Sequence, residues 1–116
     1  MPMSDYSALA LLAGEYLAGP VLGPYTIGIE ALPTAPKKLV YIVENASREV
    51  RYVGSTTQGL RQRMAQHLRD RGKVDTWDRV YAIPLKDSCD ADMVKLVEGR
   101  VGRDTSPIDG IHPRAW

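Results

Sequence analysis

The 116-residue chain has no phenylalanine, only one cysteine and no long hydrophobic run. A lone Cys89 cannot form a disulfide within the chain or build a thiolate zinc site, which excludes a disulfide-stapled scaffold and a cysteine-rich metal fold. No stretch reaches the ~18 apolar residues of a membrane-spanning helix, and the apolar run 9–17 contains Glu15 and has no basic leader. We therefore expect a cytoplasmic protein with no signal peptide and no membrane partner.

What the chain does contain is typical of one globular domain that can bury a core, with 44% apolar and 25% charged residues. Its aromatic residues are six tyrosines and two tryptophans. Each of these side chains carries a polar group, which needs a partner wherever the ring is buried.

Basic residues are absent from the first 36 positions, which carry a net charge of −3. Residues 37–74 hold nine basic and three acidic residues, a net charge of +6, and residues 75–116 carry −2. Such an asymmetry suits an anionic partner, although an ordinary solvated surface has the same appearance.

The N-terminal third differs from the remainder in pattern as well as in charge. Apolar residues at helical spacing predict a helix over residues 5–18, and alternation around 25–29 predicts a short strand. The proline-containing segment 32–36 continues neither element. We therefore expect an N-terminal extension, residues 1–36, followed by the main domain, residues 37–116.

Two β-prone apolar runs, 39–43 and 49–53, flank a loop at 44–48 and predict a β-hairpin. Helical spacing of apolar residues follows, then a further alternating run and a second helix. We expect an α/β fold of the α+β type, a small three-stranded antiparallel sheet flanked by helices, with strands at 38–43, 49–53 and 77–83 and helices at 57–71 and 90–102.

Polar side chains border the apolar faces of both helices. Arg63 and His67 are stacked neighbours beside the apolar stripe of the first helix, and Glu98 borders that of the second. Such residues are ordinarily a snorkelling arginine, a satisfied boundary histidine and an edge carboxylate. A semi-buried carboxylate can also need a cation, and Mg²⁺ is often held by only one or two carboxylates together with substrate phosphate.

The order of these residues along the chain resembles the GIY-YIG nuclease domain. The two tripeptides that name the family have degenerate counterparts in Leu39-Val40-Tyr41 and Tyr52-Val53-Gly54, and Arg63, His67 and Glu98 follow in order. The resemblance covers about residues 38–109. It implies a small antiparallel sheet flanked by helices and a metal-dependent DNA endonuclease or nickase that uses Mg²⁺ or Mn²⁺.

The resemblance also implies roles for single residues. It places Tyr41 and Tyr52 at the site, Gly54 in a tight turn into the helix, Arg63 on the scissile phosphate and Glu98 on the divalent metal. His67 matches a position that is often histidine in the family.

The family's asparagine near the end of the domain is replaced by Asp109 in this chain. The extra carboxylate could supply a second metal ligand, or it could repel the phosphate and impair the site. Gly99, directly after the metal-binding glutamate, is expected to loosen or end its helix.

Phosphodiester hydrolysis needs an activated water and charge stabilisation on the phosphoryl oxygens. We expect Tyr41 to activate the water, with its pKa lowered from about 10 by Arg63 and by a metal on Glu98. His67 would help to position the water, and Tyr52 would hydrogen-bond the phosphate or the water.

The basic block 37–74 is expected to follow DNA phosphates. The expected DNA-binding residues are Arg51, Gly54, Ser55, Thr56, Arg61, Arg69, Arg71 and Lys73. Two alternatives remain open: a catalytically silent nucleic-acid-binding module on the same fold, and a partner-binding protein in which residues 1–36 form the surface of a homodimer.

Overall fold

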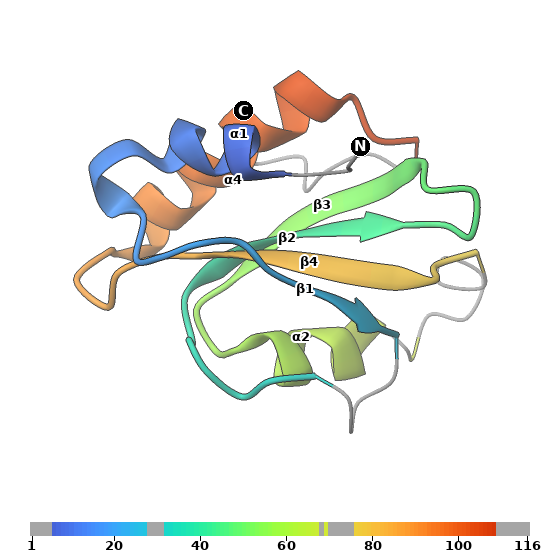
Figure 1. The fold of residues 1–116 in the computed structure, drawn as a ribbon. Helices are drawn as coiled ribbons and strands as arrows, with labels where there is room; N and C mark the ends of the chain where they lie inside the picture. Colours follow the sequence, from blue (N-terminus) through green and yellow to red (C-terminus); the bar gives the residue numbers. More distant parts are fainter. Residues whose placement is uncertain (1–5, 28–31, 68, 70–75, 109–116) are drawn as a thin grey trace.

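A computed structural model describes residues 6–27, 32–67, 69 and 76–108, and its centre is a four-stranded antiparallel sheet (Figure 1). The strands lie in the order β1-β4-β2-β3. The strands are β1 Leu22–Thr26, β2 Leu39–Glu44, β3 Val50–Thr56 and β4 Arg79–Pro84. The helices are α1 Ser7–Ala10, η1 Leu11–Tyr16, α2 Leu60–His67 and α4 Ala91–Thr105.

The predicted α+β class is confirmed, but the expected count of three strands is wrong. The N-terminal extension joins the sheet as β1, which spans Leu22–Thr26 and so begins earlier than the strand predicted around 25–29; Tyr25 pairs with Val80 of β4. Without β1, strand β4 would be an edge with unpaired backbone groups, so the added strand protects it. The extension thus contributes to the same sheet as the later strands.

The hairpin of β2 and β3 is longer than expected. Its second strand continues through Gly54 and Ser55 to Thr56, because these residues pair with Tyr41, Val40 and Leu39 of β2. The turn expected at Gly54 is therefore wrong: this glycine lies inside a strand. A strand end depends on its partner's register, which the local sequence does not contain.

The helices also depart from their predicted bounds. The predicted helix 5–18 is broken at Gly14, whose φ of 55° and ψ of −129° are not helical. The helix expected from residue 57 begins only at Leu60, after Gly59 with a φ of 98°.

The last helix is longer than predicted. Asp90 caps α4 by accepting a hydrogen bond of 2.9 Å from the Met93 backbone N–H, as expected of a residue at its start. Gly99 lies buried inside this helix, which continues to Thr105, so the expectation that it ends the helix is wrong. No described helix combines the length and the hydrophobicity that a membrane crossing requires.

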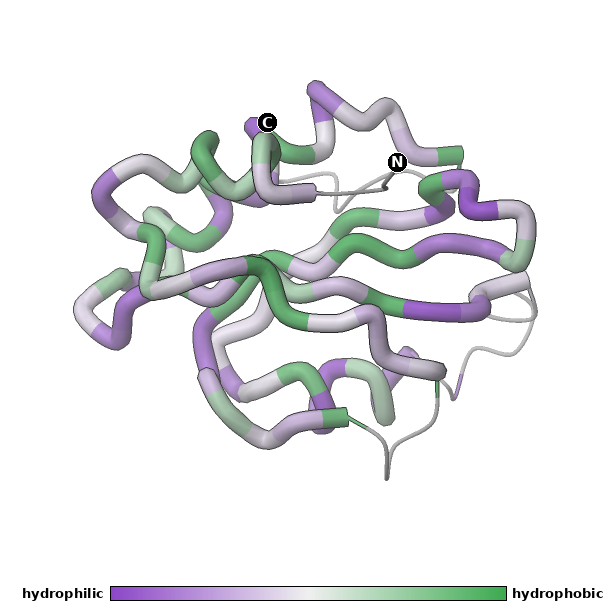
Figure 2. Tube along the Cα trace, viewed as in Figure 1, coloured by the Kyte–Doolittle hydropathy of each residue, from purple (hydrophilic) through white to green (hydrophobic). Residues whose placement is uncertain are grey.

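The sheet separates two apolar cores, and Figure 2 shows the hydrophobic stretches of its strands between the helices. Val40 and Ile42 of β2 face α4 and the N-terminal helices, where Ala13 is also buried. Tyr41 and Val43 face α2. Every residue of β2 is buried, because helices cover both faces of this central strand.

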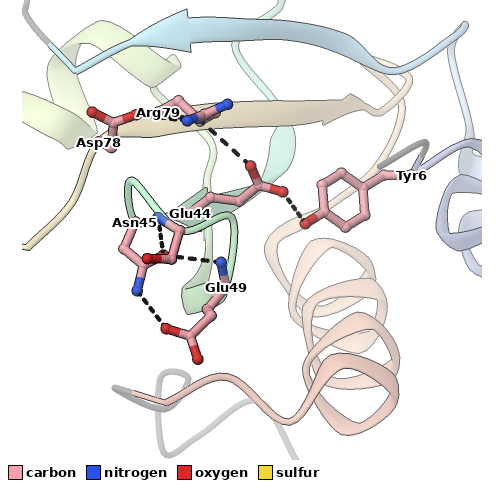
Figure 3. A network of polar contacts seen from close by, with 7 residues as sticks. Tyr6, Glu44, Asn45, Glu49, Asp78 and Arg79 are labelled. Carbon is pink, nitrogen blue, oxygen red and sulfur yellow. Dashed lines mark hydrogen bonds and ion pairs between the residues drawn. The ribbon is translucent and has the colours of Figure 1, made fainter. Parts of the chain in front are cut away.

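A buried carboxylate ties the N-terminal extension to the sheet (Figure 3). Glu44, expected in the hairpin loop, is the last residue of β2 and has no exposed surface. The Tyr6 hydroxyl donates a hydrogen bond to its Oε2, and Arg79 Nε lies 3.7 Å from its Oε1. These partners offset part of the cost of burying the charge, although Oε1 accepts no hydrogen bond among the described residues.

We predict that Tyr6→Phe destabilises the protein by about 1–3 kcal/mol, because the substitution removes a hydrogen bond to a buried carboxylate. The measurement is the free energy of unfolding in urea. Tyr16→Phe is the matched control, since the Tyr16 hydroxyl has no hydrogen-bond partner among the described residues and its ring packs against the same core. Equal losses in the two variants would contradict this role of Tyr6.

Candidate active site

A cavity of about 290 Å³ lies over the edge strand β3, between α2 and α4. Three elements contribute polar side chains to it. These side chains are Tyr52, Ser55 and Thr56 of β3, Arg63 and Gln66 of α2, and Lys95 and Glu98 of α4. Gly54 of β3 lines the cavity with its backbone.

The structure brings the five expected catalytic residues to this place in two layers. Tyr52, Arg63 and Glu98 line the cavity itself. Tyr41 and His67 lie beneath it, where they share a buried hydrogen bond of 2.6 Å between the Tyr41 hydroxyl and His67 Nε2.

Gly54 leaves the space that the Tyr41 ring occupies. The two residues are directly opposite in the β2–β3 pairing. A Cβ atom at Gly54 would come within 2.9 Å of Tyr41 Cε2 and still closer to the hydroxyl, so no larger residue fits without a shift. Because Gly54 lines the cavity, the Tyr41 hydroxyl lies immediately below the cavity floor.

An aromatic cluster supports the site from below. His67 stands edge-on to three rings, with centroid distances of 5.8 Å to Tyr41, 5.2 Å to Tyr52 and 5.1 Å to Trp77. The Tyr52 and Trp77 rings stack at 5.2 Å with an interplanar angle of 29°. Trp77 was expected only as the first residue of a strand over 77–83, and it instead precedes β4, because its place in the sequence says nothing about the hairpin that it contacts.

Arg63 brings a positive charge from α2 to the cavity. Its Nη1 donates a hydrogen bond of 2.7 Å to Gln66 Oε1, one turn further along the helix. Partial burial alone would lower the pKa of Arg63, but the hydroxyls of Tyr41 and Tyr52 and the Glu98 carboxylate outweigh this effect and raise it. The guanidinium is therefore a permanent cation at the site.

Glu98 reaches across from α4 to the edge strand. Its side chain is 1% exposed, and the Ser55 hydroxyl donates a hydrogen bond to Oε1. A carboxylate and a hydroxyl that both line one cavity are hard oxygen ligands of the kind that Mg²⁺ or Mn²⁺ takes.

The donor set around Glu98 fits a cation that keeps most of its shell for water and substrate. Among the described residues no group of three or more His, Cys, Asp or Glu gathers as a protein cage. Mg²⁺ bound by one carboxylate and substrate phosphates needs no such cage. Asp109, the expected second ligand, lies outside the described residues.

The pKa of Tyr41 moves in the direction opposite to the expected one. Complete burial raises it, and the neighbouring Tyr52 raises it further, whereas the charge of Arg63 lowers it by less. Burial likewise raises the pKa of Tyr52, against the opposing effect of Arg63. Both hydroxyls are therefore protonated at neutral pH in the protein alone.

The expected DNA-binding residues fall into separate groups. Gly54, Ser55 and Thr56 lie at the cavity. Arg61 instead donates hydrogen bonds of 3.0 and 2.8 Å from Nε and Nη2 to the Leu32 carbonyl. These bonds connect α2 to the proline-containing segment 32–36.

The remaining expected DNA-binding residues lie away from the cavity or outside the description. Arg51 is partly exposed on β3, and Arg69 is exposed beyond α2. Arg71 and Lys73 lie outside the described residues. Contact of any of these four with DNA stays a prediction.

Two further cavity residues, Gln66 and Lys95, were absent from the expected site. Each is three residues from an expected site residue, Arg63 or Glu98, and so lies on the same helix face. Helical spacing from the arginine and the glutamate could have found both.

The fold and site together define a small α+β domain in which tyrosine, arginine and glutamate side chains converge at one sheet edge. Residues 37–88, a little under half of the chain, match the model of the GIY-YIG catalytic domain, which confirms the resemblance over this segment. The GIY-YIG domain is a nuclease domain, and the matched segment contains Tyr41, Tyr52 and Arg63, whereas Glu98 follows it. No curated protein and no solved structure matches the chain.

The raised pKa of Tyr41 predicts a loss of stability at alkaline pH. An unfolded tyrosine releases its proton near pH 10, whereas the buried Tyr41 holds it to a higher pH. The free energy of unfolding is unaffected by this titration below about pH 10. It falls as the pH rises further, by at most about 1.4 kcal/mol per pH unit.

Urea unfolding of the wild type and of Tyr41→Phe, between about pH 8 and pH 11, measures this effect. The fall should be shallower in the variant, which lacks the titrating hydroxyl. An identical pH dependence in the two proteins would contradict the raised pKa.

Steric contact between Gly54 and Tyr41 predicts strong energetic coupling. Gly54→Ala should destabilise the protein by about 1–3 kcal/mol, because the methyl group overlaps with the Tyr41 ring. The loss should be smaller in a Tyr41→Val background, where the ring is absent, and a double-mutant cycle of unfolding free energies measures the difference. Additive effects would show that the ring is not what excludes alanine.

Proposed function

We propose that the protein is a metal-dependent DNA endonuclease or nickase that hydrolyses phosphodiester bonds at the cavity beside β3. The observation that carries the proposal is the convergence of Tyr52, Arg63 and Glu98 from three elements on one cavity, directly above the hydrogen-bonded Tyr41 and His67. We further propose that residues 37–116 carry the site and that residues 1–36 are a structural extension of the sheet.

Arg63 binds the scissile phosphate in this proposal. Its guanidinium can give two parallel hydrogen bonds to non-bridging phosphoryl oxygens and stabilise the charge that develops on them. The hydrogen bond from Nη1 to Gln66 holds the planar guanidinium in one orientation. Its remaining N–H groups therefore also point in fixed directions.

Tyr41 and His67 move the proton of the attacking water. Because the pKa of Tyr41 is raised, no phenolate is stored before the reaction. Instead, once substrate binding admits a water to the Tyr41 hydroxyl, this hydroxyl takes the proton of the water and passes its own proton to His67 Nε2, which the step requires to be unprotonated. Tyr52, which lines the cavity, hydrogen-bonds the phosphate or the water.

Glu98 and Ser55 would hold the divalent cation, Mg²⁺ or Mn²⁺, together with water and phosphate oxygens. When bound, the ion supplies neutralisation of negative charge on the phosphate and on the 3′ leaving oxygen. Residues 37–74, with their net charge of +6, attract DNA, so affinity should fall steeply with salt.

The proposed function predicts nicking or linearisation of supercoiled plasmid DNA with Mg²⁺ and none with EDTA. Arg63→Ala and Glu98→Gln should each lower the cleavage rate by about 100-fold or more, because each removes a charge that acts on the transition state. Asp104→Asn is the matched control, since this exposed carboxylate lies on the same helix as Glu98 but outside the cavity.

Circular dichroism and thermal unfolding verify that each variant is folded. Cleavage at the wild-type rate by both Arg63→Ala and Glu98→Gln would reject the proposal.

A catalytically silent nucleic-acid-binding module is the second candidate, because the Tyr41 side chain is fully buried in the protein alone. DNA binding without nicking over a range of Mg²⁺ and Mn²⁺ concentrations would favour it. A homodimer through residues 1–36 has less support, since β1 pairs with β4 and Tyr6 binds Glu44 of the same chain. Sedimentation of the full chain with the mass of a monomer would reject a role of the extension in assembly.

A further inference from the structure

Helix α4 directs a second charged side chain into the cavity besides Glu98. Lys95 precedes Glu98 by three residues, so the two side chains lie on neighbouring turns of one helix face, and both line the cavity. Arg63 lines it from α2. Two cations therefore flank the edge strand β3, one from each helix.

The Lys95 ammonium is not committed to another group of the protein. Among the described residues it forms no hydrogen bond or ion pair, and it does not pair with Glu98, whose Oε1 accepts from Ser55. Other basic residues are occupied differently: Lys38 donates to backbone carbonyls of Asp87 and Cys89. Lys95 is half-buried as a residue, and its ammonium has three donors, which in a polar cavity favour an anionic ligand.

We propose that Lys95 binds a DNA backbone phosphate next to the scissile one and so positions the strand. This inference rests on the proposed function. Three residues of helix displace Lys95 from Glu98 by about 4.5 Å along the axis. The ~3.4 Å rise per nucleotide is only the axial part of the distance between neighbouring phosphates, and the flexible lysine side chain can span the remainder. Lysine suits this contact, because a flexible point charge binds phosphate without a fixed geometry.

The substitution Lys95→Ala tests this assignment by separating binding from chemistry. We expect the KM for nicking and the Kd for a short mixed-sequence duplex to rise about tenfold, with kcat nearly unchanged. The slope of log affinity against log salt concentration should become less steep by about 0.9, which is the contribution of one phosphate contact. Lys95→Arg should restore both affinity and slope, which a merely structural role would not predict.

Lys86→Ala is the matched control. This lysine is exposed in the connection between β4 and α4 and does not line the cavity. The control should keep the wild-type KM, and thermal unfolding of every variant verifies the fold.

The outcomes distinguish this inference from the proposed function. Wild-type affinity and salt slope in Lys95→Ala, in a protein that cleaves DNA, would overturn the phosphate contact alone. A large loss of kcat with unchanged KM, about as severe as that expected for Arg63→Ala, would also overturn it by placing Lys95 in the chemical step. A wild type that neither binds nor cleaves DNA would reject the proposed function and this inference together.

Discussion

The close approach of the Tyr41 ring to Gly54 is the constraint on which the site depends. The pairing of these two residues sets the register of β2 against β3, and the missing side chain of Gly54 leaves room for the ring. That position brings the hydroxyl to His67 at the end of α2. A shift of one residue in this pairing would turn Tyr41 to the other face of the sheet and separate it from the imidazole.

The strand order explains why the site lies at β3. Strand β1 covers β4, so β3 remains an edge of the sheet. An edge strand can present residues from both of its faces to one cavity, and here Gly54 covers Tyr41 on the α2 side while Ser55 bonds Glu98 on the α4 side. The cavity therefore rests on both cores, and each helix is held in place by a separate apolar layer.

Local sequence patterns were sufficient for the elements that carry most of the site. The apolar runs at 39–43 and 49–53 and the helical spacing around Glu98 predicted strands and a helix that the structure contains, and Asp90 caps that helix. Helical geometry put Arg63 and His67 together, because residues four apart share a face.

What the sequence could not provide were features set by distant partners. Glu44 is followed by loop residues, and its burial depends on Tyr6 and Arg79, each more than thirty positions away. The partner of β1 could not be predicted from alternation alone, since alternation indicates a strand but not its neighbour. The pKa of Tyr41 was predicted from one nearby charge, whereas complete burial, a tertiary property, has the larger effect.

The absence of phenylalanine also acquires a partial physical explanation. Two tyrosine hydroxyls in the cores bind buried ionisable side chains, Tyr6 with Glu44 and Tyr41 with His67. Phenylalanine would fill either space but would leave the partner without this hydrogen bond. Tyr41 and Glu44 occupy opposite faces of β2, so the Tyr6 hydroxyl binds Glu44 on the α4 side and the Tyr41 hydroxyl binds His67 on the α2 side, where we propose that it transfers a proton. The alternation of side chains along β2 thus keeps the network of Tyr6 and Glu44 apart from that of Tyr41 and His67.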